Sequence, residues 1–149
     1  MDDQLSQDVS QLWSMLFSLV LDAEKRLGEH LSAQGLTSPQ FYVLKTLSEN
    51  DSRLGIGQIA RQHGLTNATM TGLIKRMEAM NPPLVERKED PNDRRAVFVY
   101  LTPIGMERYL AVQKTLFAQL YNAFGLIPEE ERAKLLEQME RYVQLLRMV

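Results

Sequence analysis

Residues 56–77 decide the fold of this chain and run Ile-Gly-Gln-Ile-Ala-Arg-Gln-His-Gly-Leu-Thr-Asn-Ala-Thr-Met-Thr-Gly-Leu-Ile-Lys-Arg-Met. Apolar residues at steps of three and four predict one short helix over residues 56–63 and another over residues 67–80. Gly64 is expected to form the turn between them, because glycine adopts backbone angles that other residues avoid. The spacing is that of a helix-turn-helix, although two short helices joined by a glycine turn also occur in plain helical cores.

The predicted crossing of the two helices depends on a few small and apolar residues. Ala60 is the small residue expected where the helices cross, and Leu65, Met70 and Leu73 are expected to supply buried contacts. His63 departs from the pattern, since an apolar residue is usual at its position. Its ring is similar in size to an aliphatic side chain, so we still expect it to pack.

The second helix presents a small and polar face on the side away from its apolar stripe. If Met70, Leu73, Ile74 and Met77 are buried, steps of 100° place Ala68, Gly72 and Lys75 on the opposite side. Glycine within a helix lowers stability by about 1 kcal/mol relative to alanine. Close approach of the helix to the major groove of DNA would explain why glycine is present here. The alternative is a solvated face with an incidental glycine. The residues predicted to contact DNA from this helix are Asn67, Ala68, Thr69, Thr71, Gly72, Lys75 and Arg76.

A change of period after the second helix predicts a two-stranded hairpin over residues 84–101. Residues 84–88 and 96–101 are the expected strands, with a polar tip over residues 89–94. Arg94 and Arg95 lie at or just after the tip, where a guanidinium can enter the negative potential of a narrow minor groove. Asp93 would be repelled by phosphate and is expected to orient a neighbouring arginine through paired hydrogen bonds. The alternative is a charged loop that only protects a sheet edge.

Long helices with broad apolar stripes flank this central part. One is predicted from residue 5 to about residue 33, one from Thr102-Pro103 to about residue 124, and one from Pro128 onward. A third short helix of the central part is expected to begin with Ser38 as its N-cap, and residues 49–53 are expected to form a polar turn. The long helices carry more apolar surface than the small centre can cover, so two chains are expected to pair. An elongated monomeric bundle is the alternative.

The fold class predicted is therefore mainly α: a winged helix-turn-helix of three short helices and a two-stranded β-wing, with a dimerisation helix on either side. The whole chain, residues 1–149, is expected to be one domain. The winged lobe spans about residues 36–102, and the dimerisation helices span about residues 4–34 and 103–148.

Composition excludes several classes of protein. The chain has 149 residues, of which 44% are hydrophobic and none is cysteine, so disulfides, thiolate metal sites and thiol switches are excluded. No apolar run reaches about 18 residues, and the acidic start lacks the basic residues of a secretory signal, so we expect a cytoplasmic protein without a membrane span. Residues 45–95 carry nine basic and seven acidic side chains, against a net charge of −2 overall. This mild difference in charge between residues 45–95 and the rest of the chain also fits an ordinary solvated surface.

Enzymatic and metal chemistry find no support in the sequence. His30 and His63 are the only histidines, and neither has a nucleophile or a glycine-rich phosphate loop close to it in the chain. A metal site would need more ligands at turn spacing. No catalytic residue, metal ligand or cofactor is therefore predicted.

The wing carries a specific family resemblance. Asp93-Arg94-Arg95-Ala-Val-Phe-Val-Tyr-Leu101-Thr102 resembles the Asp-x-Arg…Leu-Thr wing signature of the MarR family of transcriptional regulators, and residues 89–92 and 103–105 fit as well. The similarity extends over essentially the whole chain. It implies a homodimeric repressor whose helix 67–80 enters the major groove of a pseudo-palindromic operator while wing 84–101 enters the minor groove. It further implies that Asp93 positions the wing and that Arg95 is inserted, with Arg94 as the alternative.

The resemblance also implies release from DNA by a small aromatic or phenolic acid. Trp13, Phe17, Phe41 and Tyr42 could line a cavity for such an effector, but their helical spacing favours plain core positions, and no ligand residue is assigned. Two other functions remain open: a winged-helix module that binds protein without specific DNA binding, and a ligand-binding or structural dimer without a regulatory role. Retention of basic residues on both the helix and the wing favours DNA.

Overall fold

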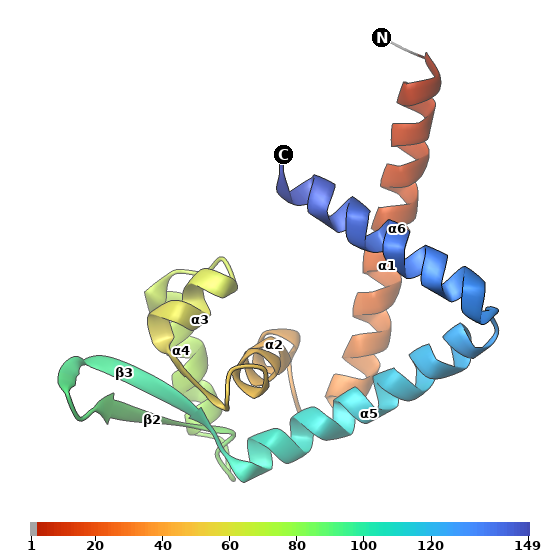
Figure 1. Cartoon of the computed structure of the whole chain (residues 1–149). Helices are drawn as coiled ribbons and strands as arrows, with labels where there is room; N and C mark the ends of the chain where they lie inside the picture. Colours follow the sequence, from red (N-terminus) through yellow and green to blue (C-terminus); the bar gives the residue numbers. More distant parts are fainter. Residues whose placement is uncertain (1–2) are drawn as a thin grey trace. The chain divides into compact units, whose positions relative to one another are not determined.

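The computed structural model describes residues 3–149, with the side chain of Arg94 left out. The chain divides into two compact units, one ending at Val112 and the other comprising Gln113–Val149. The elements follow the order α1 (Asp3–Ala33), α2 (Ser38–Ser48), β1 (Arg53–Gly55), α3 (Ile56–Gln62), α4 (Asn67–Glu78), β2 (Val85–Asp90), β3 (Asp93–Leu101), α5 (Pro103–Gly125) and α6 (Glu129–Arg147) (Figure 1). The predicted winged helix-turn-helix order is confirmed.

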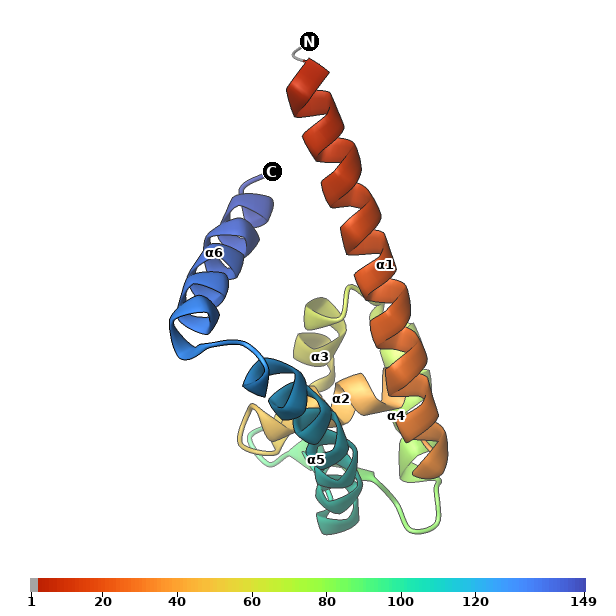
Figure 2. The same cartoon turned by 90° about the vertical axis from the view of Figure 1, so that its right-hand side faces the viewer.

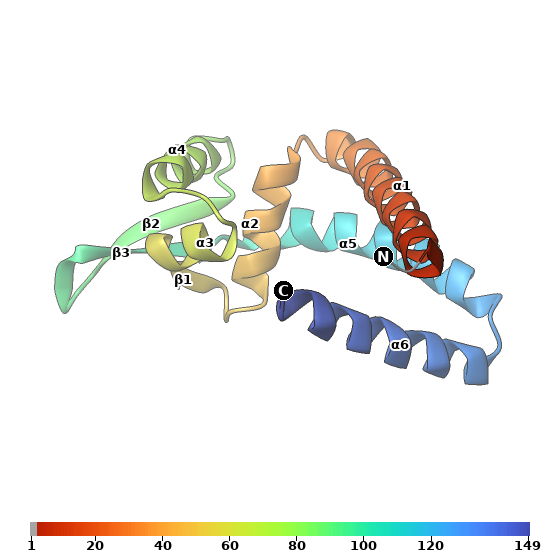
Figure 3. The ribbon, with the colours of Figure 1, turned by 90° about the horizontal axis from the view of Figure 1, so that it is seen from above.

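The core of the first unit lies where α2, α3 and α4 meet the small sheet (Figure 3). Ala60 is 1% exposed in α3, which packs against α4, so the small residue expected at the helix crossing is confirmed. Side chains from all three helices and two strands are 5% exposed or less and form one apolar cluster: Val43, Leu44, Leu47, Ile59, Met70, Leu73, Ile74, Met77, Val85 and Val99.

The sheet has one strand more than the sequence predicted, and its order is β1-β3-β2. The sequence predicts a polar turn over residues 49–53, yet β1 pairs antiparallel with β3, with Arg53 opposite Tyr100 and Gly55 opposite Phe98. Asp51 and Ser52 lead into this strand with φ values of 56° and 63°. A three-residue strand whose partner is distant in the chain leaves no local alternation, so pattern analysis misses it.

The N-terminal cap of α2 differs from the prediction. Its N-cap is Thr37 and not Ser38. The Thr37 hydroxyl accepts a hydrogen bond from the backbone N–H of Gln40 (3.4 Å), and the Gln40 side-chain oxygen accepts one from the backbone N–H of Thr37 (3.0 Å). This reciprocal capping box satisfies the backbone N–H groups of Thr37 and Gln40 at once. A cap at Ser38 would form neither of these two hydrogen bonds.

The wing is a tighter hairpin than predicted. β2 continues to Asp90 and β3 begins at Asp93, so the expected polar loop shrinks to Pro91-Asn92. The Asp90 carboxylate accepts a hydrogen bond from the backbone N–H of Asn92 (2.9 Å), which holds the turn. Arg94 and Arg95 therefore lie in the first residues of β3, directly after the turn.

Only the C-terminal end of α1 joins the core of the first unit, through Leu31, which is 1% exposed (Figure 2). Along the rest of α1 most of the large apolar side chains are exposed, including Trp13 (66% exposed) and Phe17 (57%), whose rings stack at 6.2 Å. Tyr42 is 41% exposed as well, so the core positions expected for these three aromatic residues are wrong within the single chain. Phe41 is a core residue and contacts Tyr109 with ring centroids 5.6 Å apart.

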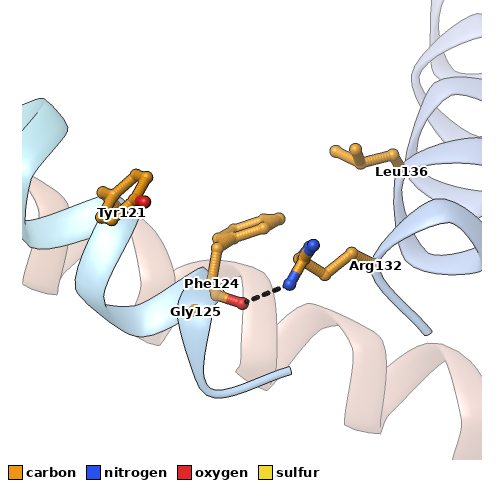
Figure 4. Close-up of a pocket in the computed structure, with 5 residues that line it drawn as sticks. All are labelled: Tyr121, Phe124, Gly125, Arg132 and Leu136. Atoms are coloured by element: carbon orange, nitrogen blue, oxygen red, sulfur yellow. Dashed lines mark hydrogen bonds between the residues drawn. The ribbon is translucent and has the colours of Figure 1, made fainter. Parts of the chain in front are cut away.

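The second unit consists of the end of α5 and all of α6. The side chain of Arg132 points back to the end of α5 and donates hydrogen bonds from Nη1 to the carbonyl oxygens of Ile127 (2.7 Å) and Phe124 (3.5 Å) (Figure 4). It borders a shallow pocket of about 270 Å³. None of the residues of α6 is buried, so the predicted apolar face, including Leu136 and Met139, is open in the single chain.

Within residues 3–149, no helix is both long enough and apolar enough to cross a membrane. The same residues contain no group of three or more histidine, cysteine, aspartate or glutamate side chains that could hold a metal ion.

Candidate nucleic-acid interface

The two faces of α4 differ as the sequence predicted. Met70, Leu73, Ile74 and Met77 point into the core and are 5% exposed or less. On the other side Thr71 and Gly72 are half-buried, and the remaining predicted DNA contacts are exposed: Asn67, Ala68, Thr69, Lys75 and Arg76. The helix therefore presents small and polar side chains with two cations at its C-terminal half, a surface suited to a DNA groove.

Gly72 is half-buried, but the space beside it on this face is free of close neighbours. A Cβ atom added there would meet only the Nη1 atom of Arg76, at 3.9 Å. Packing within the chain therefore does not require glycine at this position. The missing side chain leaves the backbone of α4 accessible, with the Arg76 guanidinium one turn away.

The N-terminus of α4 is built from threonines. The Thr66 hydroxyl accepts a hydrogen bond from the backbone N–H of Thr69 (3.2 Å) and donates one to the Thr69 hydroxyl (2.9 Å). Since a hydroxyl has one proton of its own, Thr69 keeps a donor for an external acceptor. The cap thus fixes the Thr69 side chain at the first turn of the helix.

Arg61 lies at the same end of α4 and is not among the residues that the sequence predicts to contact DNA. A Cβ atom on Gly57 would meet Arg61 Nη1 at 3.7 Å and Asn67 Oδ1 at 3.9 Å, so α3 delivers an exposed cation next to the start of α4. The available signal was its position four residues after Gly57, one helical turn along α3.

The wing places Arg95 through its backbone. The Asp93 carboxylate accepts a hydrogen bond from the backbone N–H of Arg95 (3.0 Å), whereas the sequence suggested a side-chain pair with a guanidinium. The Arg95 side chain is exposed beside the hairpin turn. The side chain of Arg94 lies outside the part of the chain that the structure describes.

Helix α4 and the wing are joined by an ion pair that the sequence did not reveal. Glu78, the last residue of α4, accepts hydrogen bonds from the backbone N–H of Arg87 (2.7 Å) and from its Nε (3.0 Å). These hydrogen bonds and the positive charge of Arg87 outweigh partial burial and lower the pKa of the Glu78 carboxyl. Next to this pair, the backbone N–H of Leu84 donates to the carbonyl oxygen of Met77 (3.2 Å).

A side-chain contact between His63 and Thr46 joins the turn between α3 and α4 to helix α2. His63 is half-buried, and its Nε2 lies 2.7 Å from the Thr46 hydroxyl, so the ring packs with a polar partner. Burial lowers the pKa of His63. Leu65 is 40% exposed, so its predicted burial is wrong: Thr66 caps α4 immediately after it, which keeps Leu65 in the turn outside both helices.

The fold and this surface define a DNA-binding protein of the winged helix-turn-helix class. A sequence model of the MarR family matches residues 36–97. The HTH-type transcriptional repressor MdtR of Bacillus subtilis (strain 168) is 30% identical over 132 residues, covering 87% of this chain and 79% of MdtR. The chain therefore belongs to the MarR family of DNA-binding transcriptional regulators.

Solved structures agree with this assignment. A MarR family protein from Bacillus stearothermophilus is 25% identical and superposes with a TM-score of 0.85, covering 95% of this chain and 97% of that one. NadR in complex with 4-hydroxyphenylacetate is 22% identical with a TM-score of 0.68, covering 85% and 88%, and it shares the fold. The family consists of transcriptional regulators and not of enzymes.

Proposed function

We propose that the chain acts as a homodimeric repressor that binds a pseudo-palindromic operator with α4 in the major groove and wing 84–101 in the minor groove. The observation that carries this proposal is the open outer face of α4 around Gly72, with exposed cations at Lys75 and Arg76. The proposed DNA contacts are Asn67, Ala68, Thr69, Thr71, Gly72, Lys75, Arg76, Arg94 and Arg95, with Asp93 orienting the wing.

The chemistry of each part fits its groove. Lys75 and Arg76 can reach phosphates or guanine edges, and threonine hydroxyls can reach bases or phosphates. A guanidinium at Arg95 gains from the enhanced negative potential of a narrow minor groove. Asp93 and Asp90 carry charges that phosphate repels, and their carboxylates instead accept backbone N–H groups of the wing.

Dimerisation follows from apolar surface that the single chain leaves open. Helix α1 exposes Trp13, Phe17 and Val20 by more than half, and α6 exposes Leu136 and Leu146 to the same degree. Exposed apolar surface of this extent marks an interface with another protein. We propose that helices 4–34 and 103–148 bind a second copy, while residues 36–102 bind DNA. Two-fold symmetry would set the half-sites about 10 base pairs apart.

Repression and control by a ligand are the finer parts of the proposal. The relative MdtR is named a repressor, and a dimer covering an operator in the cytoplasm would block transcription. NadR, which shares the fold, binds 4-hydroxyphenylacetate, so we propose that a small aromatic or phenolic acid releases this chain from DNA. Titrating the DNA complex with 4-hydroxyphenylacetate should then lower affinity, and unchanged affinity up to its solubility limit would argue against this acid as effector.

Selection from random duplex DNA tests the proposal. The full chain should enrich a sequence with two related half-sites, and its affinity should fall steeply with salt because phosphate contacts release counterions. Enrichment of no sequence would contradict specific DNA binding and would favour a winged-helix module that binds protein.

A further inference from the structure

The contact between Glu78 and Arg87 involves both the side chain and the main chain. The backbone N–H of Arg87 donates to Glu78 Oε2 (2.7 Å), its Nε donates to Oε1 (3.0 Å), and its Nη2 lies 3.0 Å from the same oxygen. One carboxylate at the end of α4 therefore holds the backbone of β2 as well as a guanidinium. Main-chain attachment fixes the strand itself, which a contact between two flexible side chains cannot do.

The location of the pair makes it a joint between two elements. Arg87 lies opposite Val99 in the sheet and two residues after Val85, both fully buried, so it is on the face of the sheet that packs against the helices. The Glu78 and Arg87 side chains are 31% and 32% exposed. By contrast, the Lys88–Glu86 pair on the same strand is 3.8 Å apart and more than half exposed.

Glu78 would be unfavourable at this position without a compensating role. It lies in the last turn of α4, where the helix dipole disfavours negative charge. In the proposed complex it would also add a negative charge to an element that approaches phosphates. Bonding to Arg87 neutralises that charge and uses both of its oxygens.

We infer that Glu78 and Arg87 are positioning residues that lock the recognition helix to the wing, so that the two elements meet DNA as one rigid unit. This inference rests on the proposed function. Specific binding to an operator requires α4 and the wing to reach their grooves together. Non-specific attraction to phosphates needs no fixed angle between α4 and the wing. Loss of the lock should therefore reduce specific binding and spare non-specific binding.

The experiment compares charge-matched variants on two duplexes: the one selected from random DNA by the wild-type chain and a scrambled duplex of equal length and composition. Glu78→Gln and Glu86→Gln each remove one negative charge, and Arg87→Gln and Lys88→Gln each remove one positive charge. Glu78→Gln and Arg87→Gln should weaken binding to the selected duplex about tenfold more than their controls, as expected for a lost charge-assisted hydrogen bond. On the scrambled duplex each variant should match its control.

Arg87→Lys retains the positive charge and the main-chain donor but loses the planar guanidinium. Its affinity for the selected duplex should therefore lie between those of the wild type and Arg87→Gln. Melting temperatures identify variants that fail to fold, and a purely structural role would lower binding to both duplexes in parallel. Parallel loss, or equal binding by Glu78→Gln and Glu86→Gln to the selected duplex, would overturn the inference. If the wild-type chain selects no duplex, the proposed function fails first, and the two failures are thereby distinguished.

Discussion

Gly105, in the first turn of α5, lies so close to Leu84 at the base of the wing that a Cβ atom on Gly105 would overlap the Leu84 carbonyl oxygen. The same carbonyl accepts a hydrogen bond from the backbone N–H of Thr102 (3.2 Å), and the Thr102 hydroxyl accepts one from the backbone N–H of Gly105 (3.0 Å). The end of β3, the start of α5 and the chain entering β2 thus meet at one point where only glycine fits.

Gly105→Ala should therefore destabilise the chain by about 1–3 kcal/mol, the usual cost of overpacking a rigid site. Gly28→Ala is the matched control, because a Cβ atom there meets nothing within 4 Å. In the interior of α1 it should stabilise by up to about 1 kcal/mol. Denaturant unfolding of both variants measures the difference, and a neutral Gly105→Ala would show that the junction can yield.

Gly72→Ala should separate stability from DNA binding. It should raise the free energy of unfolding by about 0.5–1 kcal/mol, because alanine is the better helix former and the site is open. If α4 approaches DNA closely there, affinity for the selected duplex should fall roughly tenfold, about 1.4 kcal/mol. Unfolding and duplex titration of the same preparation test this, and unchanged affinity would leave the glycine incidental.

Arg95→Ala should weaken binding to the selected duplex by about 1–3 kcal/mol while leaving the dimer intact, because it removes the proposed minor-groove contact. Lys88→Ala removes the same charge from the other strand of the wing, where Lys88 pairs with Glu86 and lies over the Tyr100 ring. It should have the smaller effect. Arg94→Ala measured alongside decides which arginine is inserted, and equal effects of Lys88→Ala and Arg95→Ala would contradict minor-groove insertion.

Trp13→Glu should shift the chain from dimer to monomer. Trp13 is 66% exposed on the apolar side of α1, and a carboxylate buried between two chains would be costly. Gln11→Glu is the control, since residue 11 lies on the far side of the helix from that stripe. Sedimentation equilibrium of both variants gives the result, and a Trp13→Glu dimer as tight as wild type would place the interface elsewhere.

Stability should fall as pH decreases below about 6.5, because His63 is protonated more readily in the unfolded chain than in the folded one. Burial lowers the pKa of His63 in the folded state, so the unfolded chain binds more protons in that window and gains stability relative to the native state. His63→Leu should remove this slope. Urea unfolding between pH 8 and pH 5 measures it, and an equal slope in wild type and variant would refute the assignment to His63.

Local signals in the sequence were enough to predict the helices of the winged lobe and the presence of the wing. Apolar steps distinguished the buried side of α4, from Met70 to Met77, from its open side, and Gly64 indicated the turn before the helix. The predicted strand ends were less accurate, because residues 89–94 look like a loop by composition although Glu89, Asp90 and Asp93 pair in the hairpin.

What the sequence did not reveal depends on contacts between distant residues. Strand β1 exists only through pairing with β3, and the Glu78–Arg87 pair joins a helix end to a strand. The aromatic residues of α1 share the spacing of a core helix, which periodicity alone cannot distinguish from a surface that covers a second chain.

The groove assignment is tested most directly by methylation interference on the selected duplex, which reports guanine N7 in the major groove and adenine N3 in the minor groove. We predict two clusters of major-groove interference about 10 base pairs apart, with minor-groove interference beside each that Arg95→Ala weakens and Lys75→Ala leaves in place. Interference confined to one groove, or a pattern without two-fold symmetry, would contradict the placement of α4 and the wing.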